Sequence, residues 1–170
     1  MPTKNSYYQK VSIGKLKMAD VREASILLRR AIEESRYYTA KDKKKEIADH
    51  SVKNLKILLK EKNRVFRVAK VDGKIAGIVE GFLPPTFGRP ALFWITWIII
   101  DKRYRRRRIG SLLMSSFEKG ADRRWQKIQG RVRVSNYASN RMFKKLGYKI
   151  IKVHRRRIKK NNAYKWERIL

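Results

Sequence analysis

The apolar run from Ala91 to Ile100 restricts the possible folds more than any other segment of the chain. It is apolar on both faces, which is typical of a strand that is covered on both sides. We therefore predict that this run lies in the middle of a sheet. Because Thr96 interrupts it and it has only about half of the ~20 residues that a membrane helix needs, we expect no transmembrane span.

Strand and helix patterns alternate on both sides of the central run, and 170 residues suit one domain, 1–170. Apolar residues at helical spacing follow Asp20, which we expect to cap that helix. Asp72-Gly73 separates two alternating segments and indicates a hairpin with a type I′ turn. We predict further strands at 11–16, 64–71, 74–82, 129–134, 148–153 and 163–170, and helices at 21–32, 41–62, 109–125 and 138–146.

The central run leads into a basic turn, Arg105 to Arg108, and then into a helix that begins near Ile109. Free backbone N–H groups and the helix dipole favour a phosphate at such a helix start. We therefore predict an anion-binding site from Arg105 to Ser111. The alternative interpretation is a solvated basic turn without a ligand.

Two patterns in this half of the chain resemble the signatures of one enzyme superfamily. The first reads Arg or Gln, two residues, Gly, one residue, then Gly or Ala, and the chain follows it from Arg105 to Gly110 with Arg108 in place of the first glycine. The second pattern is matched at Asn136, Ser139, Phe143, Gly147 and Tyr148. The chain thus resembles the GNAT superfamily of N-acetyltransferases, and residues 132–137 resemble the same stretch of bacterial and archaeal protein N-terminal acetyltransferases.

The resemblance implies an α/β fold of the α+β kind, with a mixed, mostly antiparallel sheet of about six to seven strands flanked by about four helices. It also implies acetyl-coenzyme A (acetyl-CoA) as co-substrate. Main-chain groups of Ile98, Ile99 and Ile100 would hold the pantetheine. The pyrophosphate would be held by Arg105, Arg106, Arg107, Arg108, Ile109, Gly110 and Ser111, and other parts of the coenzyme by Asn136, Phe143 and Lys145. Asn136 also suits a helix N-cap, and Phe143 also suits core packing.

Two positions that carry catalytic groups in the family carry other residues here. Phe143 stands where a tyrosine commonly protonates the departing thiolate, and Arg131 stands where the resembled enzymes often place a glutamate base. The amine must still lose a proton, so we name Glu80 and Glu34 as candidate bases. Their alternative interpretation is that of surface carboxylates. His50 and His154 lack metal-ligand spacing and suit solvated or structural roles, and we expect no metal.

Basic residues greatly outnumber acidic ones, with 45 Lys and Arg against 14 Asp and Glu and a formal net charge of +31. From Arg123 to the C-terminus there are 17 basic residues and one acidic residue, Glu167. Coenzyme A accounts for one local cluster, so a polyanionic partner such as a nucleic acid or a ribosome is the physical candidate for the rest. A solvated basic surface is the alternative.

These observations together predict an enzyme that transfers acetyl directly from acetyl-CoA to a primary amine, in a ternary complex. The amine belongs to a protein or peptide N-terminus, a lysine or a small molecule, and the loops at 36–39, 84–90 and 155–162 would select it. The alternative is a non-catalytic module of the same fold that binds nucleic acid or a protein partner. Without a secretory signal or membrane partner we expect a cytoplasmic protein; the oligomeric state stays open.

Overall fold

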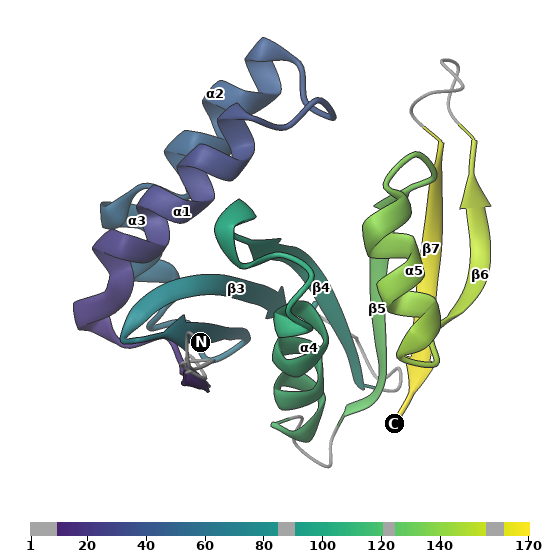
Figure 1. Ribbon diagram of the computed structural model, residues 1–170. Coiled ribbons are helices and arrows are strands. Elements are labelled where there is room, and N and C mark those ends of the chain that lie inside the picture. The colour runs from purple at the N-terminus through teal and green to yellow at the C-terminus, as the bar shows by residue number, and fades with distance from the viewer. Residues whose placement is uncertain (1–9, 85–90, 121–124, 156–161) are drawn as a thin grey trace, which may run out of the picture.

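The computed structural model describes residues 10–84, 91–120, 125–155 and 162–170. Their strands form one mixed sheet in the order β1-β2-β3-β4-β5-β7-β6 (Figure 1). The strands are β1 (Val11–Lys15), β2 (Arg64–Val71), β3 (Lys74–Phe82), β4 (Ala91–Ile100), β5 (Trp125–Arg133), β6 (Lys149–His154) and β7 (Ala163–Ile169). Only β4 and β5 pair in parallel; all other neighbours are antiparallel. The apolar run is β4, the fourth of the seven strands, which confirms its predicted central place.

Two layers of helices cover the sheet in the described part of the chain. The helices are α1 (Val21–Glu33), α2 (Ala40–Asp49), α3 (Val52–Leu58), α4 (Ile109–Lys119) and α5 (Tyr137–Lys145), with short 3₁₀ turns at η1 (Met18–Asp20) and η2 (Lys102–Tyr104). On one face, Leu28 of α1 and Leu55 of α3 pack on β2 and β3. On the other face, Phe117 of α4 and Phe143 of α5 pack on Phe93 of β4. None of the helices in the described residues is long and apolar enough to cross a membrane.

The predicted single helix at 41–62 is wrong, because the segment forms two helices, α2 and α3. Helix α2 ends at Asp49, and the Ser51 side chain caps α3 by accepting a hydrogen bond from the Asn54 N–H. A serine that satisfies the free N–H groups of a new first turn allows the chain to change direction. The break places Leu55 in the core and His50 at the end of α2.

Other predicted boundaries also shift. Asp20 does not cap α1 with its side chain, because its carboxylate instead pairs with Lys70 at 2.7 Å. Helix α4 ends at Lys119 rather than near 125, and β5 begins at Trp125 rather than at 129. The hairpin prediction is confirmed: Asp72 and Gly73 have φ values of 50° and 80°, as a type I′ turn requires.

Candidate active site

Strand β4 changes partners at Thr96, and this irregularity organises the site. In the pairing with β3, Ile95 lies opposite Gly81 and Trp97 lies opposite Glu80, so Thr96 is an extra residue without a partner in β3. On the other side, the parallel pairing with β5 runs from Ala91–Trp125 to Ile95–Gly130. Figure 1 shows β4 and β5 separating from each other beyond this point. A bulge therefore lies where the two parallel strands part.

The start of α4 has the features of an anion-binding site. Arg108 is the N-cap with a φ of 60°, and no side chain caps the helix. The N–H groups of Ile109, Gly110 and Ser111 belong to the first turn, which has no partners within the helix. Arg106 also adopts a left-handed conformation, with φ 62°. A left-handed N-cap explains why glycine suits the position that Arg108 occupies.

Gly110 does not have a left-handed conformation, and its place in α4 lies against the Met142 side chain of α5. A Cβ at this position would lie 2.9 Å from the Met142 Sδ of α5, which is closer than real Cβ contacts allow. The glycine thus lets α4 and α5 approach each other. Of the three isoleucines predicted to hold the pantetheine, Ile98 and Ile100 pack in the apolar core under α4 and α5. Ile99 is buried on the opposite face of the sheet.

Helix α5 carries three of the predicted coenzyme residues. The Asn136 side chain accepts a hydrogen bond from the Ser139 N–H at 3.3 Å, which confirms its predicted N-cap role. Phe143 is buried, with its ring 4.9 Å from that of Tyr148, so core packing is confirmed as well. Lys145 is exposed at the C-terminal end of the helix.

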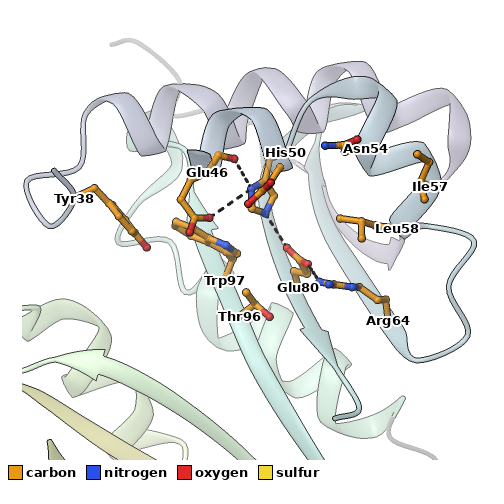
Figure 2. A pocket seen from close by; sticks show the side chains of 11 residues that line it. Tyr38, Glu46, His50, Asn54, Ile57, Leu58, Arg64, Glu80, Thr96 and Trp97 are labelled. Atoms are coloured by element: carbon orange, nitrogen blue, oxygen red, sulfur yellow. Dashed lines mark hydrogen bonds and ion pairs between the residues drawn. The ribbon is translucent and has the colours of Figure 1, made fainter. Parts of the chain in front are cut away.

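A cavity of about 460 Å³ opens on the α1–α3 face of the sheet, next to the bulge (Figure 2). Thr96 and Trp97 of β4 form part of its floor, and α2 and α3 form its wall. The lining residues are Tyr38, Glu46, Asp49, His50, Asn54, Ile57, Leu58, Arg64, Glu80, Thr96 and Trp97.

Glu80 lies at the centre of a buried ionic network in this cavity. Its side chain is 1% exposed, so the interpretation as a surface carboxylate is wrong. Arg64 Nη1 donates to Glu80 Oε1 at 2.6 Å, and His50 Nε2 lies 3.2 Å from Glu80 Oε2. Burying a carboxylate is costly unless it is paired and hydrogen-bonded, and here both oxygens have a partner. Figure 2 shows the three side chains in line.

The hydrogen bonds of His50 determine its protonation. Nδ1 lies 2.8 Å from the Glu46 carbonyl, which can only accept, and Nε2 faces the Glu80 carboxylate. Two acceptors need two N–H donors, so the ring is an imidazolium. Burial disfavours this charged form, but the hydrogen bonds to Glu80 and to the Glu46 carbonyl, together with the charges of the two carboxylates, outweigh it, and the pKa of His50 is raised. The interpretation of His50 as a solvated side chain is therefore wrong, and the structural one holds.

Glu46 and an aromatic pair complete the cavity. The Glu46 carboxylate is half-buried, with Oε2 3.8 Å from His50 Nδ1. Partial burial raises the pKa of Glu46, although the neighbouring His50 acts in the opposite direction. Tyr38 stacks on Trp97 with ring centroids 5.6 Å apart, and burial raises the pKa of Tyr38 to about 12. Tyr38 is therefore a neutral hydrogen-bond donor at physiological pH.

The structure separates the two predicted bases. Glu80 lies in the cavity, whereas Glu34 is outside it and pairs with Lys102 at 2.9 Å. Sequence reasoning did not find Glu46 or Arg64 as site residues, whereas Tyr38, which lines the cavity, belongs to the predicted substrate loop 36–39. The i,i+4 spacing of Glu46 and His50 places them on one face of α2, but it does not reveal that β3 lies opposite.

Most of the residues in the predicted substrate loops, 85–90 and 156–161, lie outside the described residues. Within the described residues, no three His, Asp or Glu side chains are grouped so that they could hold a metal ion.

A family model described as Acetyltransferase (GNAT) family matches residues 24–148 of the chain. The chain belongs to the GNAT family. The match covers both layers of helices and the sheet from β2 to β5, so it includes the bulge, the cavity and the start of α4. No curated protein matches the chain in sequence.

Solved GNAT structures share the fold at low sequence identity. The PaiA N-acetyltransferase of Thermoplasma acidophilum, determined in complex with coenzyme A, is 15% identical with a TM-score of 0.78, covering 95% of this chain and 99% of that one. A GNAT acetyltransferase of Streptococcus pneumoniae is 22% identical with a TM-score of 0.74 and the same coverage. Ard1 of Thermoplasma volcanium is 22% identical with a TM-score of 0.68, covering 94% and 97%.

The family is one of acetyltransferases, and this GNAT protein departs from its pattern at two described positions that commonly carry catalytic groups. Arg131, at the expected glutamate position, lies with Cζ 5.9 Å from the ring of Trp94. Phe143, at the expected tyrosine position, has no ionisable group. Acid-base chemistry in this GNAT domain therefore has to use another group or a water chain, and the cavity beside the bulge contains Glu46, His50 and Glu80.

Proposed function

We propose that the protein transfers an acetyl group from acetyl-CoA directly to a primary amine, with the amine entering through the cavity that contains Glu46 and His50. The observation that carries this proposal is the position of the cavity at Thr96 and Trp97. These residues belong to the part of β4 that lies beyond its last pair with β5, Ile95–Gly130. A coenzyme would then reach this stretch of main chain from the side on which β5 no longer pairs, and an amine would reach it from the cavity.

The residues around α4 fit the phosphates of acetyl-CoA. The helix start lacks a side-chain cap, and the preceding turn contributes Arg105, Arg106 and Arg107. A helix N-terminus with unpaired N–H groups and nearby cations favours phosphate binding. Beyond Ile95, β4 has no further pairs with β5, so its main-chain groups on that side could bind the pantetheine, except for the Ile100 carbonyl, which accepts a hydrogen bond from Arg105 Nε at 3.2 Å. The co-substrate would supply the acetyl group as an activated thioester.

The cavity wall provides a group that can accept the proton of the amine. An amine attacks the acetyl carbon only after losing a proton, and a positioned carboxylate with a raised pKa is a more effective base than an exposed one. Glu46 has both properties, since its pKa is raised and its side chain lines the cavity. Both oxygens of Glu80 are occupied by Arg64 and His50, so Glu80 acts as a positioning residue for His50.

Mass spectrometry of acceptors incubated with acetyl-CoA tests the proposal. Peptides with free N-termini, lysine peptides and polyamines should be compared, and at least one should gain an acetyl group. Glu46→Gln should lower kcat by about 10² or more, as expected for loss of a general base. Glu33→Gln is the control, because Glu33 is an exposed carboxylate of α1 that pairs with Arg29 at 2.9 Å and does not line the cavity, and it should leave kcat unchanged.

The alternative function is a non-catalytic GNAT module that binds nucleic acid or a protein partner. Phe143 and Arg131 favour it, because Phe143 cannot donate a proton to the departing thiolate and Arg131 cannot act as the general base. The same experiment separates the two functions. If folded protein that binds acetyl-CoA acetylates no amine in the panel, acetyl transfer is contradicted and the binding module is supported.

A further inference from the structure

One face of the C-terminal half of the sheet has a row of basic side chains. A Cβ on Gly130 would meet Phe143 of α5 at 3.4 Å, so Gly130 faces α5 and its neighbour Arg131 faces the opposite side. That opposite side is the face on which α1 and α3 pack, but these helices cover β2 and β3. Figure 1 shows α1–α3 at the other end of the molecule from β5, β6 and β7.

Three cations form a row across this face. Arg131 of β5 lies opposite Lys165 of β7, and Lys165 lies opposite Lys152 of β6. We call these three residues the cationic row. Arg131 Cζ and Lys165 Nζ lie 5.9 and 5.8 Å from the centre of the Trp94 ring. Among the described residues, no carboxylate forms an ion pair with any of the three. Glu167, the acidic residue on the same face, accepts a hydrogen bond from the Gln129 side chain and lies 3.6 Å from Lys127 Nζ.

The cationic row and the cavity lie on the same face of β4. Trp97 lies opposite Glu80, and Trp94 lies opposite Phe82, two residues further along β3, so both tryptophans project to the same side of the sheet. In the cavity, Glu80 is paired with Arg64 and His50, and Asp49 is paired with Lys45, so Glu46 is the carboxylate left for an ammonium group. The face therefore offers a carboxylate where the amine enters and cations across β5, β7 and β6.

We propose that the acceptor is a peptide whose amine is followed within the first few residues by aspartate or glutamate. This inference rests on the proposed function. The ammonium group would meet Glu46 and the carboxylates of the peptide would meet the cationic row. Neighbouring strands are about 4.8 Å apart, so the row spans roughly 10 Å, which about three residues of an extended peptide match. A nucleic acid has phosphates for the row but no alkyl amine for the cavity, where Glu46 disfavours a phosphate.

Peptide binding in the presence of coenzyme A tests this specificity without requiring catalysis. Three lysine-free peptides of equal length, labelled at the C-terminus, should be compared. After the first residue, the acidic peptide carries Asp and Glu, the amide peptide carries Asn and Gln, and the Arg peptide carries Arg. By fluorescence anisotropy at about 50 mM salt, we expect the acidic peptide to bind roughly tenfold more tightly than the amide peptide, with a smaller difference at about 300 mM because salt screens exposed charges.

Charge reversal assigns the effect to the row. Lys165→Glu should abolish the preference for the acidic peptide and improve binding of the Arg peptide. The matched control is Lys74→Glu, which changes an exposed lysine at the β2–β3 turn and should leave all three affinities unchanged. Equal binding of acidic and amide peptides, or an unchanged preference in Lys165→Glu, overturns the inference.

Three further outcomes separate this inference from nucleic-acid binding and from the proposed acetyl transfer. If transfer RNA displaces the acidic peptide and Lys165→Glu weakens RNA binding as well, the face binds nucleic acid and the inference is wrong. If the acidic peptide binds preferentially but gains no acetyl group, the preference is confirmed and acetyl transfer to it is contradicted. If amides and acids are acetylated equally well, acetyl transfer is confirmed and the acidic preference is wrong.

Discussion

His50 and Glu80 are 30 positions apart in the chain, yet His50 Nε2 lies 3.2 Å from Glu80 Oε2 in the interior. One residue ends α2 and the other belongs to β3. The contact therefore joins a layer of helices to the sheet through a charged pair rather than through apolar packing. Removing one member of such a pair leaves the other charge buried and unpaired, which is expensive.

The first prediction is that NMR titration will give His50 a pKa above the ordinary value of about 6.5. Glu80→Gln should lower it, because the hydrogen bond to the carboxylate favours the imidazolium. Glu61→Gln is the control, since Glu61 accepts a hydrogen bond from Arg64 Nε at 3.0 Å but does not contact His50. A His50 pKa at or below 6.5 in the unmodified protein contradicts the doubly protonated ring.

The same pair predicts how stability depends on pH. Because the folded state binds the His50 proton more tightly than the unfolded state does, its stabilising contribution is complete below the unfolded pKa and is lost as pH rises through the folded pKa. Urea unfolding across this range should therefore show a decrease in the free energy of unfolding that His50→Gln removes. A decrease of equal size in His50→Gln would assign the effect to other groups.

The third prediction concerns the start of α4. Ser111→Asp places a carboxylate in the first turn, where the helix dipole favours it, so the melting temperature should stay the same or rise slightly. The same carboxylate competes with phosphate for the free N–H groups and should weaken coenzyme A binding by roughly tenfold or more, as calorimetry would measure. Ser115→Asp, one turn further into the helix, should bind coenzyme A normally. Unchanged binding in both variants contradicts the phosphate site.

The fourth prediction is that Arg108→Gly stabilises the protein. Arg108 has a φ of 60°, and the left-handed conformation costs a residue other than glycine about 1 to 2 kcal/mol. Relief of this strain should raise the free energy of unfolding by up to about 1 kcal/mol after the greater flexibility of glycine in the unfolded chain is subtracted. Arg107→Gly is the control: Arg107 is not left-handed and lies 5.6 Å from the Tyr104 ring, so this change should not stabilise.

The fifth prediction concerns Gly81, next to the bulge. A Cβ there would overlap the Phe93 ring and lie 2.6 Å from the Trp94 carbonyl, which belongs to the backbone and cannot easily move. Gly81→Ala should cost about 1 to 3 kcal/mol, as overpacking does. Gly14→Ala, on the edge strand β1 with nothing within 4 Å, should change stability by less than about 0.5 kcal/mol. A similar effect of both changes would contradict the close approach.

Local patterns in the sequence were sufficient for most of the fold. A strand that is apolar on both faces must be covered on both sides, and β4 is central. The Asp72-Gly73 turn, the cap at Asn136 and the start of α4 after the arginine turn all depend on neighbouring residues along the chain, so the sequence by itself determined them. Its errors, such as the unbroken helix at 41–62, concern places where apolar spacing continues through a turn.

The composition of the cavity was decided only by the tertiary structure. Glu80 reads as an ordinary polar position in an alternating strand, and His50 reads as a lone histidine. Only the break at Ser51 and the packing of Leu55 against the sheet bring α2 over β3. The side chains of His50 and Glu80 are then both shielded from water, so they pair with each other, and Glu80 also pairs with Arg64. Burial and contact between elements depend on how layers pack, which no local spacing along the chain specifies.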